Sequence, residues 1–393
     1  MKFYKRIITL TITLFWAYLI IACGNKMPLP SVEANPESFG ANDTSYIHIN
    51  PDWDAATLGY TSENPFTPVD IKIGPDDYIF VADSANNRIV TLFMSGFVAQ
   101  QNNLNSIEPI ERPSGLAINE TLNLLIVNGT NKVFAWNQYL NTVDIESVLL
   151  GEEDDGTRTD DPTVIDSLLK VYTLFEDDSL TDASFNSIAY GSADDNSIYV
   201  TYKKYNRILE LELQQSALAE LTNGRTHPIF TAKWKRDVAT EGTGAGTVDN
   251  PKGMTTDANG NIYFTQLGGN FLVQKLEHSG SSFSPGYTLY EDPIMDLNRF
   301  KGPFDIALGE NDAIFVLDTA DSGKVTKYHN KGLMAGTKAD LGNIGLSQAR
   351  FPGARSIAIS SEEVVYIANT RLNRIDRYQY TVSEEELPDD EQR

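Results

Sequence analysis

The sequence predicts an all-β fold, and three observations lead to that class. Short apolar segments alternate with turns rich in Gly, Asp, Asn and Ser along most of the 393 residues. Apolar and polar residues alternate with period two inside these segments, as in residues 68–73, where Val69, Ile71 and Ile73 share one face. The same pattern returns six times. A repeat of this kind predicts one repeat architecture rather than several unrelated domains.

Six segments align on one apolar residue in the first strand of each repeat. These anchor residues are Ile71, Leu116, Ile188, Met254, Ile306 and Ile357. Successive anchors are separated by 45, 72, 66, 52 and 51 residues. A spacing of about 45 to 50 residues is typical of a four-stranded propeller blade, and the longer separations leave room for insertions. The sequence therefore predicts a six-bladed β-propeller over residues 46–381.

The sixth repeat ends after its third strand, so the last blade needs one more. Residues 382–393 are acidic and contain proline, and we expect them to form an acidic tail. An unpaired strand edge promotes aggregation. Residues 46–49 precede the first repeat and have strand composition. We predict that this amino-terminal strand joins the carboxy-terminal blade and closes the ring; the alternative is that it belongs to a tether.

The amino terminus predicts a secretion leader over residues 1–22. Basic side chains lie within residues 1–6, and the apolar run that follows is shorter than the roughly 20 residues that span a bilayer. The run ends in the sequence IIACG, and its Cys23 is the only cysteine of the chain. This ending resembles the bacterial lipoprotein box, which implies lipidation of Cys23. The alternative is that Cys23 lies in a transmembrane anchor.

Residues 23–45 are polar and rich in Pro and small residues, so we expect a flexible tether after the lipidated cysteine. The lipoprotein resemblance implies attachment to a membrane of the cell envelope. Gly24 carries no aspartate retention signal, which favours the outer membrane and leaves its periplasmic and surface faces open. The formal net charge of −23 repels phosphate backbones, so nucleic acid is excluded as a partner. A protein, peptide or glycan ligand remains.

Three motifs recur in the repeats: Pro-x-Gly-Ile-Ala, Gly-x-Ile-Tyr-Val-Ala-Asp and Asn-x-x-Arg-Ile. Together they resemble the NHL repeat family of six-bladed propellers over residues of about 66 to 380. Blades one, five and six match best, whereas blade two has a shortened turn and blade four lacks the Arg-Ile step. Because the Asn-Arg-Ile step recurs in several blades, we predict a structural role for it, such as pairing Arg with Asp across a hairpin.

Polar residues at the start of the inner strands form the candidate site. Asp70 and Asp305 are positioned to face the mouth of the central channel, with Asn186 and Arg355 adjacent to the same positions. Carboxylate oxygens are ligands that suit calcium or another divalent cation. The same residues also suit a pocket for a small polar ligand, and turn capping explains them without any ligand. The sequence indicates no other cofactor.

Function divides between two classes. Propellers related to this family include enzymes that use channel histidines, but His48, His227, His278 and His329 all fall outside the expected inner strands. We therefore expect a membrane-anchored module that binds or scaffolds a ligand or protein, rather than an enzyme. The alternative is a divalent-metal-dependent hydrolase or lyase, similar to the lactonase propellers, with its site at the channel mouth.

An acidic insertion separates the second and third repeats. Residues 151–180 contain several runs of Asp and Glu, and their spacing does not match the EF-hand calcium loop. Between the runs, residues 164–174 have the apolar content of a helix or a strand. For the insertion as a whole we expect a solvated acidic loop, with loose cation binding or a partner contact as the alternative.

Overall fold

A computed structural model describes the propeller region of the chain. It covers residues 45–61, 66–103, 110–151, 156–177, 179, 181–182, 184–192, 196–287, 293–309, 313–320, 323–328 and 351–381. The predicted leader, Cys23, the tether up to residue 44, His329 and the acidic tail lie outside the described residues. Among the helices within these ranges, none combines the length and the apolar content that a bilayer crossing requires.

Within the described residues, the strands form six antiparallel sheets. Blade one contains β3 (Pro68–Ile73), β4 (Ile79–Asp83), β5 (Arg88–Leu92) and β6 (Val98–Asn103). Blade two contains β7 (Gly115–Ile118), β8 (Asn123–Val127), β9 (Lys132–Asn137) and β12 (Tyr172–Glu176). Blade three contains β13 (Phe185–Tyr190), β14 (Ser197–Tyr202), β15 (Arg207–Leu221) and β16 (Thr226–Ala239).

The other three blades follow the same order. Blade four contains β17 (Pro251–Thr256), β18 (Ile262–Gln266), β19 (Val273–Ser279) and β20 (Ser282–Pro285). Blade five contains β21 (Pro303–Leu308), β22 (Ile314–Asp318) and β23 (Lys324–Tyr328). Blade six contains β24 (Ser356–Ile359), β25 (Val364–Asn369), β26 (Arg374–Thr381), β1 (Ser45–His48) and the short β2 (Trp53–Asp54). Short 3-10 turns occur at η1 (Ser84–Asn86), η2 (Tyr139–Thr142), η4 (Pro293–Met295) and η7 (Thr370–Leu372).

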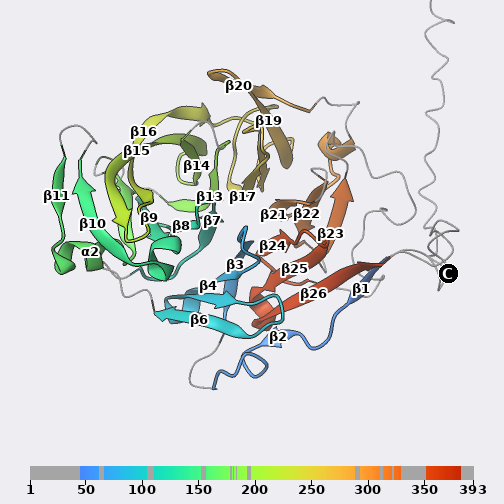
Figure 1. Cartoon of the computed structure of the whole chain (residues 1–393). Helices are drawn as coiled ribbons and strands as arrows, with labels where there is room; N and C mark the ends of the chain where they lie inside the picture. Colours follow the sequence, from blue (N-terminus) through green and yellow to red (C-terminus); the bar gives the residue numbers. More distant parts are fainter. Residues whose placement is uncertain are drawn as a thin grey trace, which may run out of the picture. The chain divides into compact units, whose positions relative to one another are not determined.

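The inner strands close a ring, as Figure 1 shows. Each inner strand contacts the inner strand of the next blade, in the order β3, β7, β13, β17, β21 and β24. The last of these, β24, contacts β3 and completes the circle. The main hydrophobic clusters lie between neighbouring blades, because apolar residues of one sheet face those of the next. Ile71 of blade one, for example, shares a cluster with Tyr366 of blade six. The predicted six-bladed β-propeller is confirmed.

The predicted ring closure is also confirmed. β1 pairs antiparallel with β26, with Tyr46 opposite Tyr380 and Ile47 opposite Gln379. The Tyr46 side chain is buried and packs its ring against Phe315 of blade five. The chain then returns so that β2 pairs with the start of β26, with Trp53 opposite Ile375. The last blade therefore takes its outer strands from the start of the propeller, which covers the edge of β26.

The Asn-Arg-Ile steps have the structural role that repetition predicts. Asn87, Asn206 and Asn373 all adopt the left-handed backbone conformation, which Asn tolerates better than most residues. Arg88 then pairs with Asp83 across the β4–β5 hairpin at 2.7 Å, and both side chains are buried. The other two arginines pair with different aspartates. Arg207 pairs with Asp237, and Arg374 pairs with Asp52 at the ring closure.

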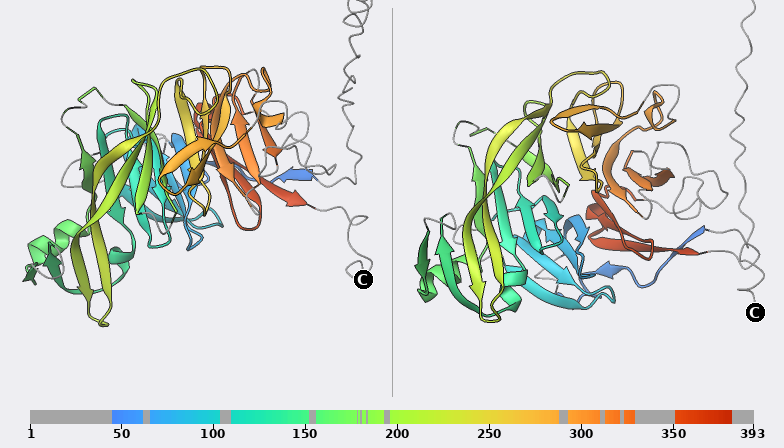
Figure 2. Two further views of the ribbon diagram at one scale, coloured as in Figure 1. Left: turned by 90° about the horizontal axis from the view of Figure 1, so that it is seen from above. Right: turned by 45° about the horizontal axis from the view of Figure 1, so that its top comes forward.

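Residues 151–180 are only in part the solvated loop that their acidic runs predict: among the described residues Asp160 and Asp161 are exposed, but the segment also forms two strands and a helix. β11 (Thr157–Thr159) pairs with β10 (Ile145–Leu150), and β10 pairs with the far half of β15. The helix α2 (Pro162–Leu168) follows, capped by the Asp161 side chain. β12 then completes blade two. Figure 2 shows β15 and β16 extending beyond the rest of blade three, and buried apolar residues such as Val148 and Ile229 hold this extension together.

Candidate functional site

The four predicted site residues meet in one cavity. Asp70 of β3, Asn186 of β13, Asp305 of β21 and Arg355, which precedes β24, all line a cavity of about 270 Å³. Every inner strand or the residue before it contributes to this lining. The cavity, called here the channel-mouth cavity, therefore lies where the six inner strands begin. The residues chosen from the sequence thus surround a real hollow in the molecule.

One ring of equivalent positions forms much of the lining. The position follows the repeat proline, or its counterpart, at the start of each inner strand. In blades one to six it carries Val69, Ser114, Asn186, Lys252, Phe304 and Arg355, and all six line the cavity. Blades one to three thus contribute neutral side chains, while blades four to six contribute two cations and an aromatic ring. The backbone repeats around the ring, but its chemistry does not.

Asp70 is held by donors from three blades. Its carboxylate accepts the backbone N–H of Leu116 in blade two at 2.6 Å and that of its neighbour Ile71 at 2.8 Å. The Ser356 hydroxyl of blade six donates to the same carboxylate, and Lys72 pairs with it at 2.9 Å. Asp70 therefore ties blade six and blade two to blade one, which is a structural role.

Asp305 has the same kind of role between blades five and six. Its carboxylate accepts the backbone N–H of Ile357 in blade six at 2.9 Å. Burial raises the pKa of Asp305 to about 6; Lys72 opposes that rise, and the nearby Asp70 carboxylate adds to it. Burial works against the charge of Lys72, but Asp70 and Asp305 together raise its pKa above the ordinary value. Lys72 is therefore a half-buried cation that pairs with Asp70 and is also attracted by the charge of Asp305.

Three further cations face the cavity: Lys203 from the turn after β14, Lys252 from β17 and Arg355. Within the described residues, no carboxylate forms an ion pair with any of the three. Burial lowers the pKa of Lys252, and the positive charges of Lys203 and Arg355 lower it further. Lys252 and Arg355 both lie near the Phe304 ring, at 5.8 and 5.9 Å from its centroid. Like charges are therefore gathered here around an aromatic face.

The balance of charge disfavours a cation at Asp70 and Asp305. The described lining holds four cationic side chains against these two carboxylates, in a chain whose formal net charge is −23. A divalent cation would meet a wall with a net positive charge, which Coulomb repulsion opposes. Both carboxylates already accept backbone N–H groups, so fewer oxygen lone pairs are available as ligands. The geometry favours the second alternative from the sequence, a pocket for a polar ligand.

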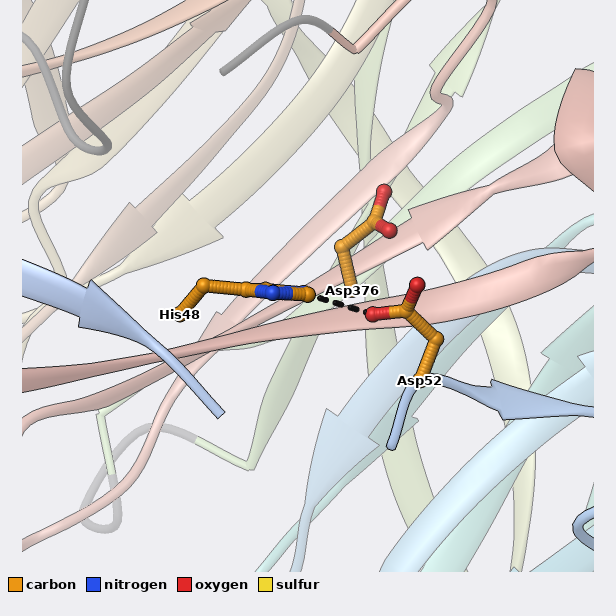
Figure 3. A group of neighbouring side chains, drawn as sticks. All are labelled: His48, Asp52 and Asp376. Atoms are coloured by element: carbon orange, nitrogen blue, oxygen red, sulfur yellow. Dashed lines mark hydrogen bonds and ion pairs between the residues drawn. The ribbon is translucent and has the colours of Figure 1, made fainter. Parts of the chain in front are cut away.

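A separate acidic group lies at the ring closure, and Figure 3 shows His48 and Asp52 facing each other beside Asp376. One potential ligand atom from each lies within 4.8 Å of the others, the arrangement that a metal ion needs. Arg374 pairs with Asp52 at 2.8 Å and with Asp376 at 2.7 Å, and His48 Nε2 lies 2.6 Å from Asp52. The group is thus already supplied with positive charge from the protein itself.

The described histidines lie where the sequence places them. His48 is in the closing strand β1, His227 is in the outer strand β16, and His278 is near the end of β19, the third strand of blade four. None of these three lines the channel-mouth cavity. Burial lowers the pKa of His227, whose ring lies 2.6 Å from the Asn137 amide. A histidine-dependent site at the cavity is therefore not formed by the described histidines.

Sequence reasoning missed Lys203, Lys252 and Phe304. Comparing the residue after the repeat proline across all six blades would have found Lys252 and Phe304, because the ring positions are equivalent. Lys203 follows the second strand of its blade, where the equivalent residues are Ser84, Leu267 and Thr319. Each of these donates its backbone N–H in the same way, but only Lys203 carries a charge. That irregularity was the available signal.

Comparisons with known proteins find partial sequence similarity and broader structural similarity. No family model matches it. Teneurin-4 of Homo sapiens is 24% identical over 161 residues, covering 36% of this chain and 6% of the relative, and Teneurin-4 of Mus musculus matches equally. The chain therefore spans only a small fraction of the curated relatives that it matches.

Solved structures with similar architecture cover most of the chain. Virginiamycin B lyase from Staphylococcus aureus aligns over 86% of this chain and 99% of its own, with 13% identity and a TM-score of 0.46. A gluconolactonase from Xanthomonas campestris aligns over 88% and 99%, with 11% identity and a TM-score of 0.48. The calcium-binding protein regucalcin from Agrobacterium tumefaciens aligns over 81% and 91%, with 10% identity and a TM-score of 0.45. At these identities the ligands of the neighbours do not carry over to this chain.

Proposed function

We propose that this chain is a lipoprotein of the cell envelope whose propeller binds a small polar ligand at the channel-mouth cavity. The lipoprotein assignment rests on the leader and Cys23, and it favours the outer membrane as the site of attachment. The ligand assignment rests on the cavity. A scaffolding role for a protein, peptide or glycan partner is compatible with the same anchor, and the acidic net charge disfavours nucleic acid.

One observation carries the proposal: the ring of equivalent lining positions is chemically asymmetric. Repetition around a propeller serves the fold, because every blade needs the same turns and the same core. Departures from repetition that converge on one hollow serve no such need. Lys252, Phe304 and Arg355 occupy consecutive blades four to six, and Asn186 precedes them on the neighbouring blade three. Ligand pockets combine apolar surface with a few placed polar groups in this way.

A second candidate is a hydrolase or lyase at the same cavity. The observation in its favour is Asp305, a buried carboxyl with a pKa of about 6, which is close to the value that suits an acid or base at neutral pH. A lactonase-like enzyme would also need a divalent cation, and the positive lining works against that requirement. Binding without chemistry is therefore the function that the geometry supports best.

The ligand proposal is tested on the full chain in non-ionic detergent. Thermal unfolding is followed with panels of neutral sugars, short peptides, organic anions and divalent cations, because a ligand that binds only the folded state raises the midpoint. Ser187→Phe would fill the cavity from β13, and Ser361→Phe is the matched control on an exposed turn. We expect at least one compound to stabilise the protein and the Ser361→Phe variant, but not Ser187→Phe. No stabilisation by any panel would count against the proposal.

The anchor is tested separately. Cys23→Ser should abolish incorporation of a fatty-acid label and move the protein from the membrane fraction to the soluble fraction, because two or three acyl chains are what hold a lipoprotein to a bilayer. The matched control is Ser45→Ala, which leaves Cys23 in place. Retention of the label in Cys23→Ser would contradict the lipoprotein assignment without affecting the cavity.

A further inference from the structure

Three cations from different blades of this acidic chain converge on one cavity. Lys203, Lys252 and Arg355 come from blades three, four and six, and they meet on the lining of the channel-mouth cavity. By contrast, Lys204, which follows Lys203 in the same turn, pairs with Asp182 outside the cavity. Cations on protein surfaces usually keep apart or pair with carboxylates. Three cations that converge without a described carboxylate partner favour an anion from outside.

We propose that the channel-mouth cavity is a binding site for a small oxyanion, held by Lys203, Lys252 and Arg355. This inference rests on the proposed function and specifies the ligand class. Arg presents a planar fork that matches the oxygens of a carboxylate, sulfate or phosphate, and Lys adds point charges beside it. An anion bound among the three cations would replace their mutual repulsion by attraction.

The other residues that line the cavity indicate which groups, besides the anionic one, the ligand has. Ser114, Asn186 and Ser187 also line the cavity, and they offer hydroxyl and amide groups to a hydroxylated ligand. Phe304 lies among the cations and provides an apolar face of the kind on which a sugar ring packs. A cavity of about 270 Å³ holds a small molecule rather than a polymer. Together these features fit a hydroxylated organic acid or a sugar that carries phosphate or sulfate.

The acidic exterior is consistent with a small ligand. A formal net charge of −23 repels long polyanions, whose charges extend over much of the protein surface. A small anion interacts mainly with the nearest groups, since salt screens charges beyond about 8 to 10 Å at physiological ionic strength. The site therefore selects small anions over nucleic acids and polyanionic glycans.

The pKa of Lys252 supports this interpretation. Burial and the neighbouring charges of Lys203 and Arg355 lower that pKa, so the protonated amine is less stable here than in water. A bound anion would reverse the effect and restore the proton affinity of Lys252. Keeping Lys252 protonated therefore costs free energy in the ligand-free protein. The fold does not need a cation at this position, because the equivalent residue in blade one is Val69.

The test compares charged and neutral probes on the full chain in detergent. Glucuronate is matched with glucose, which lacks only the charge, and acetate, inorganic sulfate and inorganic phosphate separate the kinds of oxyanion. Tris or bis-Tris chloride buffers are used at matched ionic strength, because buffer anions would compete. Thermal unfolding identifies the best oxyanion, and calorimetry then measures its dissociation constant.

Three variants assign the binding to the cavity. Lys252→Gln and Arg355→Gln remove one lining charge each, and Lys204→Gln removes an equal charge from the outside of the same turn. We expect the best oxyanion to bind at least tenfold more weakly to both lining variants and within twofold of wild type to Lys204→Gln. Lys252→Arg, which keeps the charge, should retain most of the affinity. Raising sodium chloride from 20 to 300 mM should weaken binding several-fold.

Several results would overturn the inference. Absence of stabilisation by all four oxyanions would do so, as would equal binding to wild type and Lys252→Gln, which would indicate nonspecific attraction. If glucose bound as well as glucuronate, and Ser187→Phe abolished both, the cavity would bind a neutral ligand. In that case the anion inference would fall and the proposed ligand-binding function would stand. If no class of compound bound at all, both would fall.

Discussion

The ring closure and the channel mouth use charged residues in opposite ways. At the closure, Arg374 pairs with both Asp52 and Asp376, and His48 Nε2 lies within hydrogen-bond distance of Asp52. At the channel mouth, three cations line one cavity, and burial together with the charges of Lys203 and Arg355 lowers the pKa of Lys252. The closure joins the two ends of the propeller sequence, whereas no ion pair among the described residues joins Lys203, Lys252 or Arg355 at the channel mouth to another blade.

The difference separates structural charges from functional ones. Paired charges at the closure satisfy one another, so they need no further partner and contribute to the fold. Like charges that lie close together repel one another in the free protein, and a bound ion of opposite charge replaces this repulsion by attraction. Asp70 belongs with the first kind although it lies at the cavity, because its donors come from its own and the neighbouring blades. The number of internal partners, rather than the location, distinguishes the two kinds.

The largest expected effect is the loss of Trp53 at the closure. Trp53 is buried, its ring lies 4.3 Å from the Arg377 guanidinium, and it packs near Tyr366. Trp53→Ala should lower the free energy of unfolding by about 3–5 kcal/mol, because it leaves a large cavity. Trp234, which is 51% exposed, is the control, and Trp234→Ala should change it by no more than about 0.5 kcal/mol.

Thermal unfolding followed by circular dichroism measures both variants. If the closure is purely structural, Trp53→Ala should bind the best oxyanion with wild-type affinity at temperatures where it remains folded. Loss of binding in the folded variant would break the distinction between the two regions.

The next effect concerns Asp70, which lies at the cavity but has structural bonds. Asp70→Ala leaves the buried Leu116 N–H without its acceptor and Lys72 without its ion pair. We expect a loss of about 1–3 kcal/mol in the free energy of unfolding. Anion affinity should stay the same or increase, because the variant removes a negative charge from the lining. A stable Asp70→Ala protein that no longer binds would make Asp70 a member of the ligand site.

A third prediction uses the pKa of Asp305. Because that pKa is raised to about 6, lowering the pH through 6 protonates Asp305 and removes a negative charge from the cavity. Lys72, whose pKa lies above its ordinary value despite burial because of Asp70 and Asp305, keeps its charge over this range. Affinity for glucuronate, which stays ionised, should therefore rise about fivefold from pH 7.5 to pH 5, or about 1 kcal/mol.

The same pKa has a consequence for stability. A carboxyl whose folded pKa lies above its unfolded value costs stability when it is ionised. The cost is absent below pH 3.8, grows between 3.8 and about 6, and is complete above 6. Asp305→Asn should flatten the pH dependence of both binding and stability. An unchanged pH profile in Asp305→Asn would show that another group is responsible.

The smallest expected effect is that of divalent cations. Calcium, magnesium, manganese or zinc at 1 mM should shift the unfolding midpoint by less than about 1 °C compared with EDTA, because the cavity lining is positive. An ion-specific rise that disappears in Asp70→Ala or Asp305→Ala would instead support the metal-dependent hydrolase, and lactone and ester substrates would then be assayed. A rise that disappears in Asp52→Ala would place the ion at the closure.

Much of the fold was predictable because its signals are local or regularly spaced. Alternation within residues 68–73 identifies a strand, and the anchor spacing identifies the blades. The closing strand followed from counting strands in the last repeat. The acidic insertion was predicted only in part, because the place of its apolar stretch depends on distant partners: β12 pairs with β9, and its Leu174 and Phe175 are buried in the core between blades two and three.

The candidate site was only partly predictable. Asp70, Asn186, Asp305 and Arg355 were found because inner strands of a propeller begin at the channel. Their roles were not predictable, because whether a carboxylate binds a ligand or a neighbouring N–H depends on the register between blades. Asp70 and Asp305 connect blades, and the predicted site did not include Lys203 and Lys252.

The sequence by itself determined the number of blades, the strand that closes the ring and the motif turns, because each depends on residues near one another or on a regular repeat. Only the tertiary structure decided that Lys203, Lys252 and Arg355 share one cavity. They come from three different blades, and nothing in their local sequence brings them together. Closure of the ring does so, because it turns equivalent positions along the chain into neighbours around a single channel.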